Sequence, residues 1–327
     1  MNENPKFRGI HHITAITSSA AENLAFYENV LGLRLVKKTV NYDDPYTYHL
    51  YYGNSSGAPG TILTFFPWEN LPLGEAGAGM VASFAFSIPM GSVDYWRKRL
   101  IARGVETTVG QRFGDRLIQF DDPHGLSLEL IETPAVHSTL NRSSNPKSAA
   151  HGIVGFHSAT ALLRSLDETQ SLLVNLMGME LHDTEDNRYR FKMKNNASFG
   201  HFYDLVIDAQ AEDGRQGAGT VHHIAFRTPT DAEQEYWQKS IMDKGFSVTP
   251  IRDRKYFKSI YFHEPGGVLF EIATDAPGFT LDEPYESLGR DLKLPDQYEP
   301  IRNEIEGRLP KLQVDRKKDA DLLDNVG

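Results

Sequence analysis

The 327-residue chain contains no cysteine. This absence excludes disulfide bonds, a thiolate nucleophile and any metal site with cysteine ligands, and it favours a reducing, cytoplasmic location. If the protein binds a metal, the ligands must come from histidine, aspartate, glutamate or backbone oxygen.

Long apolar runs and an excess of positive charge are also missing. No run approaches the roughly 18 residues of a membrane helix, and the first residues, MNENPKFRG, lack the apolar core of a signal peptide. A net charge of -10, from 44 acidic and 34 basic residues, argues against a nucleic-acid surface. We therefore expect a globular protein of two domains with neither nucleic acid nor membrane as a partner. The sequence leaves the oligomeric state open, a homo-oligomer included.

An internal repeat organises the chain. Residues 80–104, MVASFAFSIPMGSVDYWRKRLIARG, match residues 220–245, TVHHIAFRTPTDAEQEYWQKSIMDKG, at an Ala-Phe pair, a proline, a Tyr-Trp pair and a final glycine. Further along, residues 120–130, FDDPHGLSLEL, match residues 262–272, FHEPGGVLFEI. A weaker similarity relates the first and third quarters. We therefore expect four units of about 50 to 60 residues, paired as 1-2 and 3-4.

Each unit has the same expected order of elements, a strand, a helix and three short β-rich stretches. The helix ends at a glycine, the residue that best adopts the left-handed C-cap conformation, in turn Gly32, Gly104, Gly178 and Gly245. The pattern predicts an α+β fold of four βαβββ modules. The expected parts are a first domain of two modules (1–135), a linker rich in Ser, Asn and Pro (136–150), a second domain of two modules (151–276) and a C-terminal arm (277–327).

Two expected strands each carry a pair of adjacent histidines, in RGIHHITAIT and TVHHIAFRT. On a regular strand, neighbouring side chains point to opposite faces, so the two rings of a pair should serve different roles. The sister strand of the second unit has Ala82 and Ser83 where the fourth unit has His222 and His223. A single His-His pair is most simply explained by packing. Its recurrence at equivalent positions, with the sister strand lacking it, favours a chemical role instead.

A carboxylate completes the pattern. Glu271 lies within the apolar strand GGVLFEIATD and aligns with Glu129 of the second unit. A charge buried there needs a cation or hydrogen bonds, although an exposed edge strand would also accommodate it. His12 and His223 occupy equivalent positions in their strands, each directly before an isoleucine. With Glu271 they match the two-histidine, one-carboxylate set that binds Fe(II) on one face.

At this point the chain resembles the vicinal oxygen chelate superfamily, which includes glyoxalases, bleomycin-resistance proteins and extradiol dioxygenases. The motifs GIHHIT, VHHIAF and DRKYFKSIYFHEPGGVLFEIATD resemble more narrowly those of the ring-cleaving dioxygenases that act on hydroquinones. The resemblance covers nearly the whole chain. It implies two glyoxalase-like barrels, and an enzyme that inserts both atoms of O2 into a small aromatic diphenol.

The resemblance also implies roles for single residues. Its iron ligands correspond to His12, His223 and Glu271, and Mn(II) shares these ligand preferences. The residues expected around the metal are His11, Thr14, His222, Arg254 and Tyr261. Without the family pattern, Arg254 and Tyr261 would be taken for a surface cation and a core tyrosine.

The ligands would come from the first and fourth units, so the barrels should pair modules across the chain. His157 lies within a residue of the place of His12, and with Glu129 it would mark an inactive sister site in which Ser83 replaces the third ligand.

Three other functions fit parts of the pattern. A glyoxalase-like lyase or isomerase would use Zn(II) or Ni(II), usually with a fourth protein ligand, and no matching strand offers a clear candidate. A catechol extradiol dioxygenase would use the same triad on a different diphenol. A protein that only sequesters an aromatic ligand would share the fold but lack the triad, and in this sequence all three ligand positions are occupied.

Overall fold

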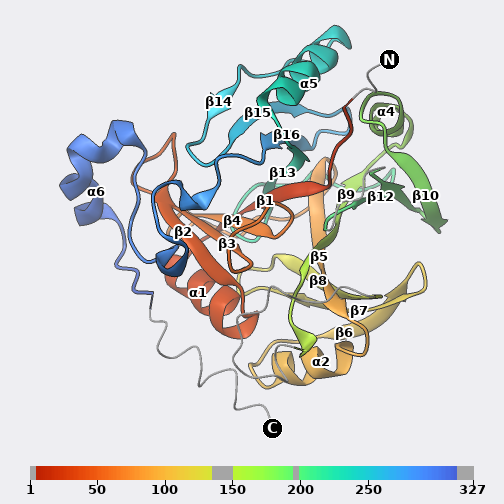
Figure 1. Ribbon diagram of the computed structural model, residues 1–327. Coiled ribbons are helices and arrows are strands. Elements are labelled where there is room, and N and C mark those ends of the chain that lie inside the picture. Colours follow the sequence, from red (N-terminus) through yellow and green to blue (C-terminus); the bar gives the residue numbers. More distant parts are fainter. Residues whose placement is uncertain (1–4, 135–149, 194–198, 315–327) are drawn as a thin grey trace.

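The computed structural model describes residues 5–134, 150–193 and 199–314. The expected linker at 136–150 therefore lies, except for its last residue, outside the described residues. The described chain forms two curled eight-stranded sheets with the helices on their outer faces (Figure 1). This is the α+β fold of four βαβββ modules that the repeat predicts, arranged as the two half-barrels that the family resemblance implies.

The first sheet joins the first and fourth modules. Its strand order is β14-β15-β16-β13-β1-β4-β3-β2. The strands of the first module are β1 (Ile10–Thr17), β2 (Arg34–Val40), β3 (Tyr48–Gly53) and β4 (Ile62–Pro67). Those of the fourth module are β13 (Val221–Thr228), β14 (Arg252–Asp253), β15 (Lys258–His263) and β16 (Leu269–Thr274).

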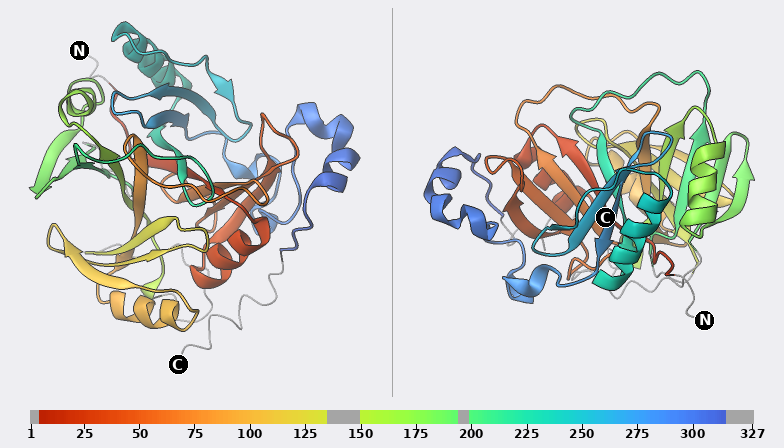
Figure 2. Two further views of the ribbon diagram at one scale, coloured as in Figure 1. Left: turned by 180° about the vertical axis from the view of Figure 1, so that it is seen from behind. Right: turned by 90° about the horizontal axis from the view of Figure 1, so that it is seen from above.

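The second sheet joins the second and third modules in the order β10-β11-β12-β9-β5-β8-β7-β6. The second module supplies β5 (Met80–Pro89), β6 (Thr108–Arg112), β7 (Asp115–Asp121) and β8 (Ser127–Thr133). The third supplies β9 (Gly155–Leu163), β10 (Glu180–Glu185), β11 (Arg188–Lys192) and β12 (Phe202–Ile207). Each sequence half thus gives one module to each sheet, and the two sheets lie side by side (Figure 2).

One helix packs outside each module. These helices are α1 (Ala20–Leu24) continued by the π-helical η1 (Ala25–Val30), α2 (Val93–Ile101), α4 (Asp167–Ser171) continued by η2 (Leu172–Leu176), and α5 (Asp231–Asp243). The side chains of Ser19 and Thr230 cap α1 and α5 by accepting a backbone N–H three residues on. The four glycines expected to end these helices all have positive φ, between +70° and +90°.

The C-terminal arm covers β2 and the edge of the first sheet. It contains the short helices η3 (Phe279–Leu281), η4 (Tyr285–Ser287), η5 (Asp296–Ile301) and α6 (Arg302–Arg308). Beneath it, the ammonium of Lys37 is fully buried and donates to Asp282 at 2.6 Å and Glu283 at 2.5 Å. The arm also contacts the end of β2 and its loop, since the hydroxyl of Tyr298 donates to the backbone oxygen of Tyr42 at 2.6 Å.

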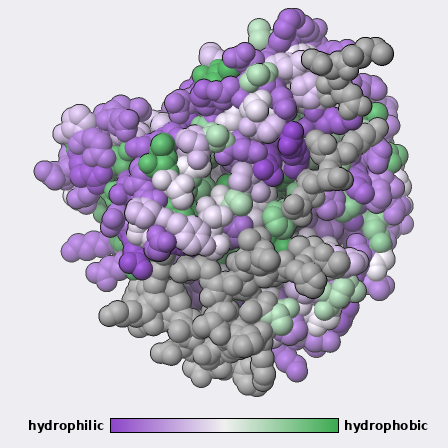
Figure 3. All heavy atoms as spheres, viewed as in Figure 1, coloured by the Kyte–Doolittle hydropathy of each residue, from purple (hydrophilic) through white to green (hydrophobic). Residues whose placement is uncertain are grey.

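Hydrophilic side chains dominate the face of the molecule in Figure 3, with hydrophobic ones scattered between them. Among the described residues, no helix has the length and apolar character needed to cross a membrane.

Candidate metal centre

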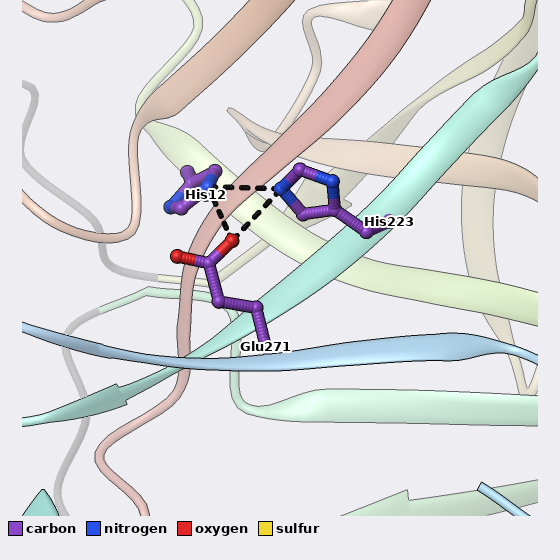
Figure 4. Close-up of side chains that lie close together, drawn as sticks. All are labelled: His12, His223 and Glu271. Carbon is purple, nitrogen blue, oxygen red and sulfur yellow. Dashed lines mark hydrogen bonds and ion pairs between the residues drawn. The ribbon is translucent and has the colours of Figure 1, made fainter. Parts of the chain in front are cut away.

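Three side chains from adjacent strands of the first sheet converge inside its curve. His12 comes from β1, His223 from β13 and Glu271 from β16, and all three are buried (Figure 4). His223 Nε2 lies 2.8 Å and His12 Nε2 lies 3.3 Å from Oε2 of Glu271, and the two ring nitrogens are 3.4 Å apart. The structure therefore brings together the three residues that the sequence singles out as metal ligands.

The donor set suits a divalent cation. Glu271 is fully buried, and its Oε2 atom faces the ring nitrogens of His12 and His223 without a hydrogen bond of good geometry to either. Burial alone would raise the pKa of Glu271, but the two histidines facing it hold that pKa well below its usual range. Three ligand atoms about 2.1 Å from one ion at right angles would lie about 3 Å apart, close to the observed triangle. The arrangement thus fits a cation held on one face, with its other side open.

The two rings of each histidine pair lie against each other because both strands are bulged. The register between β1 and β13 pairs Ile10 with Phe226 and then His12 with Ala225, so His11 has no partner of its own. A second shift, between Thr14 and Ala15, leaves His222 unpaired in the same way. A bulge re-aims side chains that a regular pleat would send to opposite faces. The regular alternation expected from the sequence is therefore wrong at these two positions.

Each bulged histidine holds its neighbour by a ring-to-ring hydrogen bond. The Nδ1 atoms are 2.9 Å apart in the first pair and 2.8 Å apart in the second. For Nε2 of His12 or His223 to offer a lone pair to a cation, its Nδ1 must carry the proton and donate it to His11 or His222. Burial keeps both acceptors neutral, because it lowers the pKa of His11 far below its usual value and that of His222 to about 3.

The two acceptor histidines differ in access. The ring of His11 is buried behind His12 and bonds the backbone of Thr274, and it is not among the residues that line the cavity beside the triad. His222 does line it, together with Thr14, Arg254 and Tyr261. Four of the five residues expected around the metal therefore face the cavity, and the fifth contacts a ligand histidine.

The cavity has a volume of about 540 Å³ and mixes aromatic with polar side chains. Arg254 Nε donates to the hydroxyl of Tyr261 at 3.3 Å, and its guanidinium lies over the Tyr261 ring, 5.5 Å from the centroid. Burial, with Glu271 nearby, raises the pKa of Tyr261, so the phenol keeps its proton. This wall therefore presents a neutral phenol beside a permanent cation.

Sequence reasoning missed three residues of this region, His49, Tyr51 and Thr64. His49 and Tyr51 line the cavity, and Thr64 bonds His49 Nε2 at 2.9 Å. The repeat contains the signal that would have found them. On the fourth-module side, Tyr261 of β15 pairs with Glu271 of β16, and on the first-module side Tyr51 of β3 pairs with Thr64 of β4. Thr64 thus occupies the position related to Glu271 by the pseudo-twofold symmetry of the sheet.

In the second sheet, the place that corresponds to the metal centre of the first sheet is occupied by an ion pair between Arg112 and Glu129. Its register pairs Ser83 with Thr160 and Ala85 with Ser158, so Ser158 rather than His157 stands where His12 stands. His157 is the bulged residue, and its Nδ1 lies 3.0 Å from the Ser158 hydroxyl, as His11 lies against His12. Glu129 accepts two hydrogen bonds from Arg112. A guanidinium here takes the role that a metal would have in the first sheet.

Comparisons with known proteins agree with this architecture. The family model of the glyoxalase/bleomycin resistance protein/dioxygenase superfamily matches residues 9–130 and 155–272. The chain is 47% identical to the "Putative ring-cleaving dioxygenase MhqO" of Bacillus subtilis over 93% of this chain and 97% of that protein. It is 36% identical to the chlorohydroquinone/hydroquinone 1,2-dioxygenase of Sphingobium indicum, over 92% and 95% of the two chains. A crystal structure described as a putative dioxygenase from Bacillus subtilis superposes with a TM-score of 0.90 at 47% identity, covering 95% of this chain and 99% of that one.

Proposed function

Because the chain belongs to the glyoxalase/bleomycin resistance protein/dioxygenase superfamily, we propose that it is an Fe(II)-dependent ring-cleaving dioxygenase of hydroquinone-type diphenols. His12, His223 and Glu271 would hold the iron, and O2 and the diphenol would be the two substrates. The full-length similarity to a chlorohydroquinone/hydroquinone 1,2-dioxygenase supports the substrate class. The facial arrangement of three buried ligand atoms supports the metal.

The observation that carries the proposal is the residue opposite Glu271. A fourth protein ligand would come from the symmetry-related position, and that position holds Thr64, an alcohol engaged with His49. A site with three protein ligands keeps more positions open than a glyoxalase-like site with four. Both the diphenol and O2 can therefore reach the ion, which favours dioxygenase over lyase chemistry.

The cavity residues have complementary roles toward a diphenol. When bound, Fe(II) would acidify a substrate hydroxyl and pass electron density from the ring to O2. Arg254 polarises the Tyr261 hydroxyl by donating to its oxygen, so that this phenol becomes a stronger hydrogen-bond donor toward a negative oxygen in the cavity. His222, whose Nδ1 accepts from His223, carries its own proton on Nε2 and offers a second donor.

The proposal is tested by O2 consumption. Protein purified without air and loaded with Fe(II) or Mn(II) is supplied with a panel of hydroquinones and catechols, and its metal content is measured in parallel. We expect O2 uptake with hydroquinones, in proportion to bound iron, and slower uptake with catechols. Faster uptake with catechols would move the protein to the extradiol class. Zinc in the purified protein and no O2 uptake with any diphenol would refute the dioxygenase proposal.

A further inference from the structure

Four side chains of the first module form a continuous hydrogen-bonded chain along one wall of the cavity. The hydroxyl of Tyr51 lies 2.9 Å from His49 Nδ1, and His49 Nε2 lies 2.9 Å from the Thr64 hydroxyl. The Thr64 hydroxyl lies 2.9 Å from that of Thr14. Tyr51 and His49 are on β3, Thr64 is on β4 and Thr14 is on β1, two residues from His12. The chain thus ends beside the triad.

Three of these four residues differ in type from their counterparts in the fourth module, and only the tyrosine is shared. By the register of the sheet, the positions of Tyr51, His49, Thr64 and Thr14 correspond to Tyr261, Ser259, Glu271 and Ala225 in the fourth module. In the fourth module, the Ser259 hydroxyl donates to Oε1 of Glu271. Ala225, at the position of Thr14, has no polar side chain that could continue a row of hydrogen bonds. One module therefore supplies the ligand carboxylate, while its partner supplies an uncharged hydrogen-bonded chain in the same place.

The chemistry of the groups fixes the direction of the chain. Burial lowers the pKa of His49 well below its usual value and raises that of Tyr51, so the imidazole is neutral and the phenol keeps its proton. A neutral imidazole has one donor and one acceptor nitrogen. Because a phenol is a good donor and a weak acceptor, Tyr51 donates to Nδ1 of His49. The Nε2–H of His49 then donates to Thr64, and the hydroxyl of Thr64 donates to Thr14. The proton of Thr14 is the one left without an acceptor in the chain, at the cavity wall.

We propose that His49 and Tyr51 are positioning residues that fix the Thr14 hydroxyl as a hydrogen-bond donor to the ionised oxygen of the diphenol. This inference rests on the proposed function for the identity of the ligand. The direction of the chain does not, because it is a property of the protein alone. A donor held in one direction stabilises a phenolate more than a hydroxyl that must first reorient, since no ordering is left to be done on binding.

The first test needs neither metal nor turnover. ¹⁵N chemical shifts of the imidazoles in metal-free protein identify which nitrogen carries the proton. We expect His49 to be protonated on Nε2, with Nδ1 accepting the hydrogen bond from Tyr51. In Tyr51→Phe this hydrogen bond is lost, so the ¹⁵N chemical shift of His49 Nδ1 should change. A wild-type His49 protonated on Nδ1 would overturn the proposed direction.

The second test measures binding of hydroquinone to the Fe(II) protein without O2, by calorimetry. Thr64→Val keeps the shape of the side chain and leaves the Thr14 hydroxyl in place, but it removes the donor that orients this hydroxyl. Binding should therefore weaken by up to about tenfold. Tyr51→Phe should weaken it in the same direction with iron content unchanged. The control is Tyr52→Phe: Tyr52 bonds Asn23 and does not line the cavity, so affinity should stay at the wild-type value.

Wild-type affinity in both Thr64→Val and Tyr51→Phe would overturn the positioning role. If wild-type protein fails to bind hydroquinone at all, the substrate class of the proposed function fails, and the ¹⁵N shifts alone then decide the direction of the chain.

Discussion

Replacing Glu271 by glutamine tests the assignment of the metal ligands most sharply. The amide keeps an oxygen to accept the hydrogen bond from Ser259. Its NH₂ group would face the Nε2 atoms of His12 and His223, which lie 3.3 and 2.8 Å from the present Oε2. Because the amide stays within reach of Ser259 and of both ring nitrogens, the metal-free variant should still fold, and its melt without metal serves as its own baseline.

The expected difference appears when Fe(II) is added. A ligand at about a hundred times its Kd stabilises the folded protein by about 2.7 kcal/mol. In a protein of 327 residues that corresponds to a rise in Tm of about 4 °C. Wild-type protein should show this rise in an anaerobic thermal melt, and Glu271→Gln should show almost none.

Glu129→Gln is the matched control, because Glu129 holds the equivalent position in the second sheet and is paired with Arg112. This variant should lose stability from the unpaired guanidinium but keep the Fe(II)-dependent rise. An equal rise in Glu271→Gln and wild type would refute the ligand assignment.

Three further changes test other parts of the structure. Lys37→Met leaves two carboxylates of the arm without their buried ammonium, and should lower the free energy of unfolding in urea by about 3 to 5 kcal/mol; an unchanged midpoint would contradict the buried pairing. Burial lowers the pKa of His201 to about 4, so the unfolded chain binds a proton below about pH 6.5 while the folded protein does not. Stability should therefore fall from pH 7.5 to 5 by about 2 kcal/mol more in wild type than in His201→Asn, again measured in urea. Thr64→Glu places a second carboxylate opposite Glu271, and should retain iron in metal analysis while O2 uptake is lost; full O2 uptake would contradict the pseudo-symmetric geometry.

The sequence was sufficient to find the residues that differ between repeats. His222 and His223 align with Ala82 and Ser83, and a difference of this kind is visible without coordinates because the scaffold is shared. The four modules and their glycine-ended helices were predictable for the same reason.

The bulges were not predictable. A one-residue shift in register depends on pairing between strands more than 200 residues apart, as in β1 and β13. It changes the direction in which His11, His222 and His157 point. The row of hydrogen bonds from Tyr51 to Thr14 was not predictable for a related reason. His49 and Thr64 come into contact only after β3 and β4 are paired.

The central claim is that this protein inserts both atoms of O2 into a hydroquinone ring, and one mass spectrum tests it directly. Anaerobic Fe(II) protein is mixed with hydroquinone and ¹⁸O₂, and the product is reduced at once with borohydride so that a new aldehyde oxygen cannot exchange with water. We expect a ring-opened product that carries two ¹⁸O atoms. An intact ring, or a ring-opened product in which the new oxygen atoms come from water, would contradict the account.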